Sequence, residues 1–163
     1  MKEEFVFYTI GVYGFTEDVF FNKLVENHID TFIDVRRRRG VRGSKYSFVN
    51  SKKLQKKLKE LNIYYEHIIE LSPTKEIREL QKKDDQKKGI LKRERNFLSD
   101  IFKSEFQKKI LDNFDFDKFL NHLEKIGAKN IIFFCVEKNY LACHRSLITQ
   151  KLEEYYNFNI RHL

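Results

Sequence analysis

Residues 130–149 are NIIFFCVEKNYLACHRSLIT, and this stretch decides the fold more than any other part of the chain. It opens on apolar or thiol residues without a break from 131 to 135, which is typical of a strand buried on both faces of a sheet. A polar loop follows, and helical spacing of apolar residues begins near Cys143. The stretch therefore predicts a strand, a turn and a helix. Both cysteines of the chain lie at that turn, together with Glu137, His144 and Arg145.

The flanking sequence repeats this alternation of strands and helices. Apolar runs predict further strands at residues 5–10, 31–35, 63–69 and 158–163, and helical spacing lies between them. We therefore expect a single three-layer α/β domain over residues 1–163, with a mostly parallel sheet of about five strands and helices on both faces. Residues 72–127 are expected to form a helical insertion, with Pro73 at its first helical position and a polar loop or hinge at 82–95.

The composition limits the class of protein. Hydrophobic residues make up 41% and aromatic residues 15% of the 163 residues, which argues against disorder throughout, and one proline with six glycines argues against an all-β fold. The net charge of +8 favours a polyanionic partner, although a lysine-rich solvated surface gives the same number. We expect a cytoplasmic protein with reduced thiols, no signal peptide and no membrane segment.

Polar residues follow several of the predicted strands. Gly11, Asp34 with Arg36, and Cys135 with Glu137 all fall at strand carboxyl ends, which meet at one edge when strands are parallel. The expected catalytic candidates are Asp34, Glu137, Cys135 and His144, and the expected ligand-binding residues are Gly11, Arg36, Cys143, Arg145 and His162. Asp34 and Glu137 would give a pair of carboxylates for acid–base chemistry, and Arg145 at a helix start would suit a phosphate. Buried packing cysteines and an ion pair of Asp34 with Arg36 or Arg145 are the structural alternatives.

A basic segment follows the strand at residues 31–35. Its candidate nucleic-acid-binding residues are Arg37, Arg38, Arg39, Arg42 and Lys45, with aromatic residues after them. An ordinary solvated basic loop is the alternative.

We expect no metal and no other cofactor. Cys135, Cys143, His144 and His162 carry suitable ligand atoms, but the spacing is not that of a Cys-x-x-Cys pair. In addition, Cys143 and His144 are adjacent, and adjacent side chains on a helix point in different directions.

Several short motifs resemble those of the domain of unknown function 488 family. They are Thr9-Ile10-Gly11, Asp34-Val35-Arg36, Tyr65-x-His67, Leu71-x-Pro73-Thr74, Cys135-x-Glu137, Cys143-His144-Arg145 and a terminal His162-Leu163. The resemblance covers nearly the whole chain and implies an α/β fold with a shared polar pocket, but no particular reaction. A fainter similarity is to rhodanese-like domains, although the chain lacks the arginine that closes the anion loop of the cysteine phosphatases, six residues after the cysteine.

Two main functions remain open at this point. The first is a protein, catalytic or not, that acts on or binds a phosphate-bearing ligand such as nucleic acid or a nucleotide. The second is a non-catalytic nucleic-acid-binding or regulatory module, and a cysteine-dependent sulfur transferase is a third. A deep polar cleft at the strand ends would favour the first function, and a flat basic face the second.

Overall fold

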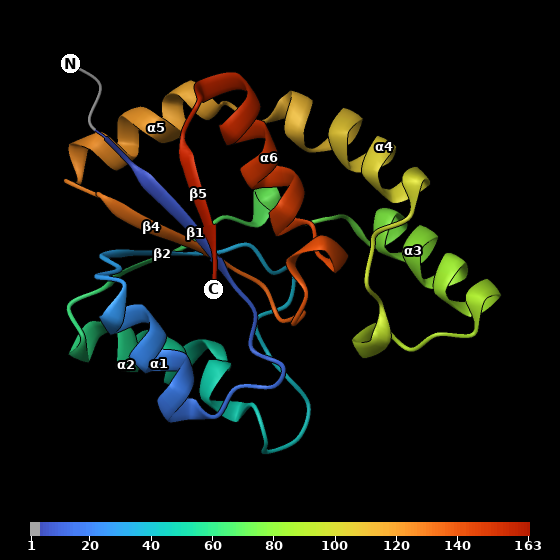
Figure 1. Ribbon diagram of the computed structural model, residues 1–163, viewed down its shortest axis with the longest axis horizontal. Coiled ribbons are helices and arrows are strands. Elements are labelled where there is room, and N and C mark those ends of the chain that lie inside the picture. Colours follow the sequence, from blue (N-terminus) through green and yellow to red (C-terminus); the bar gives the residue numbers. More distant parts are fainter. Residues whose placement is uncertain (1–3) are drawn as a thin grey trace.

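The computed structural model describes residues 4–163, apart from the side chain of Arg93 (Figure 1). Its centre is a sheet of five parallel strands in the order β3-β2-β4-β1-β5. These strands are β1 (Val6–Ile10), β2 (Thr31–Asp34), β3 (Tyr64–His67), β4 (Asn130–Phe134) and β5 (Asn159–His162). The predicted α/β class and strand number are confirmed, and the sheet is entirely parallel.

Helices cover both faces of this sheet. They are α1 (Glu17–Glu26), α2 (Ser51–Glu60), α3 (Lys75–Lys88), α4 (Asp100–Lys109), α5 (Phe116–Lys125) and α6 (Arg145–Tyr156). Figure 1 shows α1 and α2 on one face and α5 and α6 on the other, with α3 and α4 to one side. No helix among the described residues is both long enough and apolar enough to cross a membrane.

The central strand β4 shows why the apolar run has no polar interruptions. Its side chains alternate between the two layers of helices, and both layers are apolar. The Phe133 ring lies 6.2 Å from that of Phe119 on α5, whereas the Phe134 ring lies 5.5 Å from that of Phe20 on α1. Both phenylalanines are fully buried. A strand in this position needs apolar residues at every step.

The predicted bounds of α3 are wrong at both ends. Thr74 caps this helix, because its hydroxyl accepts a hydrogen bond from the Ile77 amide, so Pro73 precedes the cap and does not occupy the first helical position. The helix continues to Lys88, into the stretch expected to be a loop, and ends at Gly89 in the left-handed conformation. The helical spacing of apolar residues does not extend over the whole of α3, because two of its buried side chains, Gln81 and Asp85, are polar.

The strand order creates a crevice between β2 and β4. The chain leaves β2 toward α2 on one face of the sheet and leaves β4 toward α6 on the other face, although the two strands are neighbours (Figure 1). In parallel α/β sheets, such a switch point is where ligands bind. The basic segment follows β2, and both cysteines follow β4, so the sequence candidates lie at this crevice.

Candidate functional site

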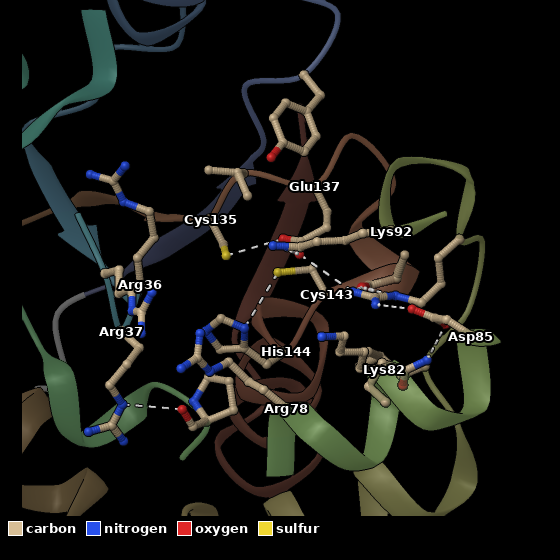
Figure 2. Close-up of a pocket in the computed structure, with 18 of the residues that line it drawn as sticks. Arg36, Arg37, Arg78, Lys82, Asp85, Lys92, Cys135, Glu137, Cys143 and His144 are labelled. Carbon is tan, nitrogen blue, oxygen red and sulfur yellow. Dashed lines mark hydrogen bonds and ion pairs between the residues drawn. The ribbon is translucent and has the colours of Figure 1, made fainter. Parts of the chain in front are cut away.

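A cavity of about 720 Å³ opens at the switch point. One wall consists of the basic segment after β2 and of the turn between β4 and α6, and the other consists of α3 and the chain that follows it. Figure 2 shows the two cysteines and His144 between the arginines of the basic segment and the polar side chains of α3. The size is within the usual range of pockets for small ligands, about 300–1,000 Å³.

Positive charge dominates the lining. The lysines and arginines are Arg36, Arg37, Arg38, Arg42, Arg78, Lys82, Lys92 and Arg95, and the carboxylates are Asp85 and Glu137. Both carboxylates already have cations: Asp85 lies 2.9 Å from Arg95, and Glu137 lies 3.4 Å from Lys92 and 3.5 Å from Arg95. The Glu137 carboxylate raises the pKa of Lys92 and keeps that amine charged. A large positive excess therefore remains in the cavity.

Two of these arginines have buried donors that are not used within the described part of the chain. They are Nη1 of Arg36 and Nε of Arg78. Arg37, by contrast, donates to the backbone carbonyls of Ser72 and Pro73, at 3.3 and 3.2 Å. A buried N–H group without an acceptor destabilises the fold, so such donors favour a ligand that supplies oxygens.

The Asp34–Arg36 ion pair is structural. Asp34 is fully buried behind the cavity and accepts two hydrogen bonds from the Arg36 guanidinium, at 2.9 and 2.8 Å. Tyr65 donates to the same carboxylate at 2.7 Å, and burial together with Asp34 raises the pKa of Tyr65 to about 12. His67 donates to the Arg36 carbonyl. The Tyr65-x-His67 motif thus fixes the end of β2, and the expected pair of cleft carboxylates does not form because Asp34 does not line the cavity.

Cys135, Cys143 and His144 form a thiol–imidazole cluster on the wall of the cavity. Sγ of Cys135 donates to the Glu137 carboxylate at 3.2 Å, and Sγ of Cys143 lies 3.6 Å from Nδ1 of His144. The other ring nitrogen of His144, Nε2, lies 2.8 Å from the Val35 carbonyl. Because a carbonyl only accepts, Nε2 carries the proton, and the ring orientation is fixed. Both thiols are free in this structure.

The environment shifts the pKa values of the two thiols in opposite directions. The neighbouring Cys143 sulfur, burial and the Glu137 charge all raise the pKa of Cys135. Burial also raises the pKa of Cys143, but the neighbouring Cys135 thiol and the charges of His144 and Arg145 outweigh it and lower that pKa well below its ordinary value. Burial lowers the pKa of His144, and the Cys143 thiolate more than reverses this and raises it. The two thiol pKa values therefore move in opposite directions, and the environment favours the thiolate at Cys143 over the thiolate at Cys135.

The backbone explains how two adjacent residues converge. Cys143 is extended, with φ −135° and ψ 145°, and only His144 has helical angles before α6 begins at Arg145. The expectation that Cys143 and His144 point apart assumed that both lie on a helix. Since Cys143 precedes the helix, that argument does not apply to this turn.

Three predicted ligand-binding residues lie behind the cavity instead of lining it. Gly11 packs against the Glu137 carbonyl. His162 hydrogen-bonds to Thr9 at 2.7 Å, and its ring stacks on that of Tyr140. Arg145 is 1% exposed; one of its nitrogens lies 3.5 Å from the Lys138 carbonyl, and its Nε and Nη1 have no acceptor among the described residues. The predicted site residues thus gather at one sheet edge, but only some of them line the cavity. Those that do are Cys135, Glu137, Cys143, His144 and Arg36.

The basic segment divides in the same way. Arg37, Arg38 and Arg42 line the cavity together with Arg36. Arg39 instead lies near Tyr65, whose pKa its charge lowers in part, and Lys45 lies over the ring of Tyr46. The charge of the four lining arginines thus lies at the open cavity, with Arg38 and Arg42 also exposed to solvent.

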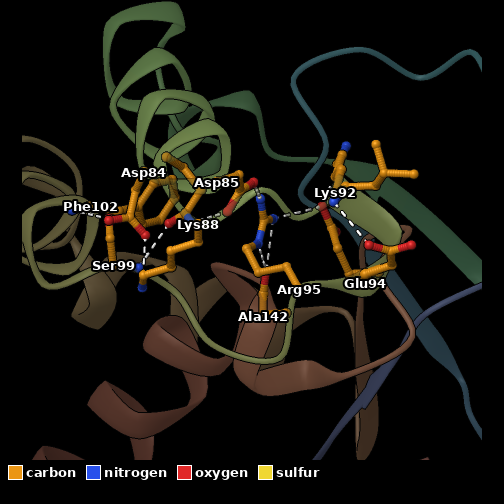
Figure 3. Close-up of polar contacts among 12 residues, drawn as sticks. Asp84, Asp85, Lys88, Lys92, Glu94, Arg95, Ser99, Phe102 and Ala142 are labelled. Carbon is orange, nitrogen blue, oxygen red and sulfur yellow. Dashed lines mark hydrogen bonds and ion pairs between the residues drawn. The ribbon is translucent and has the colours of Figure 1, made fainter.

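Sequence reasoning missed the second wall of the cavity. Arg95 connects the two walls: it donates to Asp85 on α3 and, at 3.0 Å, to the Ala142 carbonyl just before the cysteine (Figure 3). Arg78, Lys82 and Lys92 come from the same part of the chain. The one sequence signal was the polar, charged composition of residues 82–95, which is equally typical of a solvated loop.

Fold and site together define a class: a parallel α/β protein with a cationic cavity and a thiol–imidazole cluster at the switch point of its sheet. The chain belongs to the family described as "Domain of unknown function DUF488", whose model matches residues 17–152, more than half of the chain. The expected family is therefore confirmed, and the comparisons do not show the rhodanese-like similarity. No curated protein and no solved structure matches the chain.

Proposed function

We propose that the cavity binds a phosphate-bearing ligand of about nucleotide size. The observation that carries this proposal is the excess of lysine and arginine over carboxylate around a cavity of about 720 Å³. Like charges gathered around a cavity repel one another, so this arrangement is unfavourable without an anion. Arginine forks suit phosphate oxygens, because two parallel N–H groups match two oxygens.

Two unused hydrogen-bond donors at the cavity also support a phosphate ligand. Nη1 of Arg36 and Nε of Arg78 are buried at the cavity, and a phosphate oxygen would satisfy either one. Glu137, Cys143 and His144 line the same cavity, so groups able to transfer a proton or attack an electrophile would lie beside the ligand.

The decisive variant is Arg78→Gln. Because no carboxylate of the described residues pairs with Arg78, this change should leave the melting temperature without ligand unchanged or raise it slightly. It should also reduce the stabilisation by pyrophosphate and by nucleoside triphosphates, measured by thermal shift and calorimetry. Lys53→Gln is the matched control, since Lys53 is exposed on α2 and the change removes the same charge. Equal ligand responses of the two variants, or no response of the wild type, would overturn the proposal.

The alternative of a nucleic-acid-binding module predicts a different pattern. Replacement of Arg37, Arg38 and Arg39 by Ala would remove up to three phosphate contacts and lower the log–log salt slope on duplex DNA by as much as about 2.7. The cavity proposal expects the small phosphates to compete with the DNA, because Arg37 and Arg38 line the cavity. Oligonucleotide binding that pyrophosphate does not displace would favour the alternative.

A further inference from the structure

We propose that Cys135, Cys143 and His144 form a zinc-binding site on the wall of the cavity. One ligand atom from each residue lies within 4.8 Å of the other two, and all three residues are buried. The proposal does not depend on the phosphate ligand, because it rests on different side chains.

The distances fit a tetrahedral ion. Zinc lies about 2.3 Å from a cysteine sulfur and about 2.0–2.1 Å from a histidine nitrogen, and a tetrahedral angle then places sulfur and nitrogen about 3.6 Å apart. Sγ of Cys143 and Nδ1 of His144 are 3.6 Å apart. Two thiolates on the same ion would be about 3.8 Å apart, which is compatible with the 4.8 Å limit of this cluster.

The imidazole already has the orientation of a ligand. Nε2 of His144 donates to the Val35 carbonyl at 2.8 Å, so Nδ1 is the nitrogen that faces the sulfur. Metal-binding histidines nearly always donate their other ring N–H to a carbonyl or carboxylate in this way. Val35 follows β2 directly, and the sheet therefore holds the ring in place.

The ligand set selects the metal and leaves one position open. Two thiolates and an imidazole favour zinc over magnesium or calcium, which prefer oxygen. Two negative thiolates also balance the charge of the ion. Because all three residues line the cavity, the fourth position is left to water or to an oxygen of a bound ligand, as in zinc sites that perform chemistry.

Cobalt substitution tests the site directly. The full chain, reduced and freed of metal with a chelator, is titrated with Co²⁺, and thiolate-to-cobalt absorption is recorded. We expect saturation at about one ion per chain and displacement of cobalt by Zn²⁺. The Cys135→Ser and Cys143→Ser variants should lose the thiolate absorption or weaken it strongly. His122→Gln is the control, since His122 pairs with Glu66 outside the cavity, and it should bind as the wild type does.

A second measurement covers variants that fail to fold. The chain has two cysteines, so mass spectrometry after alkylation counts both thiols in the wild-type protein itself. Zn²⁺ should slow the alkylation of both, and Mg²⁺ should not. A titration without thiolate absorption, or zinc that leaves alkylation unchanged, overturns the site.

The two proposals can fail separately. The zinc titration is done without phosphate, and Arg78→Gln should bind zinc as the wild type does. If the protein binds zinc but none of the phosphates, the phosphate proposal is refuted and the zinc site is supported. The opposite result would refute the zinc site alone.

Discussion

Gly11→Ala should destabilise the protein by steric contact alone. A Cβ atom at this position would lie 1.9 Å from the Glu137 carbonyl oxygen and 2.8 Å from its carbon. Real Cβ contacts essentially never fall below 3.0 Å, so the carbonyl would have to move by at least about 1 Å. The obstacle is backbone and not the end of a flexible side chain. The amides of Val12 and Tyr13 also donate to the neighbouring Val136 carbonyl, so the two loops cannot separate freely.

The expected loss is at the upper end of overpacking effects, about 3 kcal/mol. For a chain of this length each kcal/mol shifts the melting temperature by about 2–4 °C, so the variant should melt roughly 6–12 °C below the wild type. Because the carbonyl that must move belongs to Glu137, whose side chain lines the cavity, ligand binding should weaken as well.

Gly40→Ala is the matched control. A Cβ atom at Gly40 meets only the Asn50 side chain, at 3.8 Å, which is ordinary contact. Its φ lies outside the left-handed region, so alanine should be neutral or stabilising by about 0.4–1 kcal/mol. Calorimetric melting of the two variants decides the question. A Gly11→Ala protein that melts within about 2 °C of the wild type would refute the close approach of these two loops.

Two further predictions concern Arg95 and His162. Arg95→Met should cost about 3–5 kcal/mol in urea unfolding, because it leaves the largely buried Asp85 carboxylate without its cation, whereas Lys88→Gln, which breaks an exposed pair, should cost less than about 1 kcal/mol. Similar losses of unfolding free energy in the two variants would mean that the Arg95 contacts contribute little to stability. Burial, and then the Arg145 charge, lower the pKa of His162, so the unfolded chain binds the proton more readily and stability should fall as pH drops below about 6.5. His162→Asn should lose less stability than the wild type between pH 7.5 and 5.5, and parallel melting curves would contradict this.

The part of the site that the sequence predicted is the part attached to strands. An apolar run that ends in polar residues indicates a strand end, and parallel order then brings such ends together, as with Arg36 and Cys135. The same logic could not tell a residue that lines the cavity from one behind it. Asp34 and Gly11 lie at the same edge, but their surroundings depend on neighbouring chains: Tyr65 covers Asp34, and the Glu137 carbonyl covers Gly11.

Hydrophobic periodicity could not predict the second wall of the cavity, and the reason is physical. Hydrophobic spacing detects faces that are buried because they are apolar, but α3 buries Gln81 and Asp85 through hydrogen bonds with the Ser99 amide and with Arg95. Such partners are specific side chains and amides outside the helical pattern, so composition alone indicates a solvated loop.

The two walls have different origins, and this constrains how the site can work. The sheet edge supplies the thiol–imidazole cluster and the arginines after β2, fixed by the backbone of five paired strands. The α3 side supplies Arg78 and Lys82, and beside the apolar packing of Phe106 on His144 it contacts the sheet side through polar contacts of Arg95 and Lys92 to Glu137 and the Ala142 carbonyl. Polar contacts of this kind are more easily broken than a packed core. A bound anion that touches both walls would add contacts across this joint, so occupancy should stabilise residues 78–95 more than the sheet, as hydrogen exchange with and without pyrophosphate would reveal.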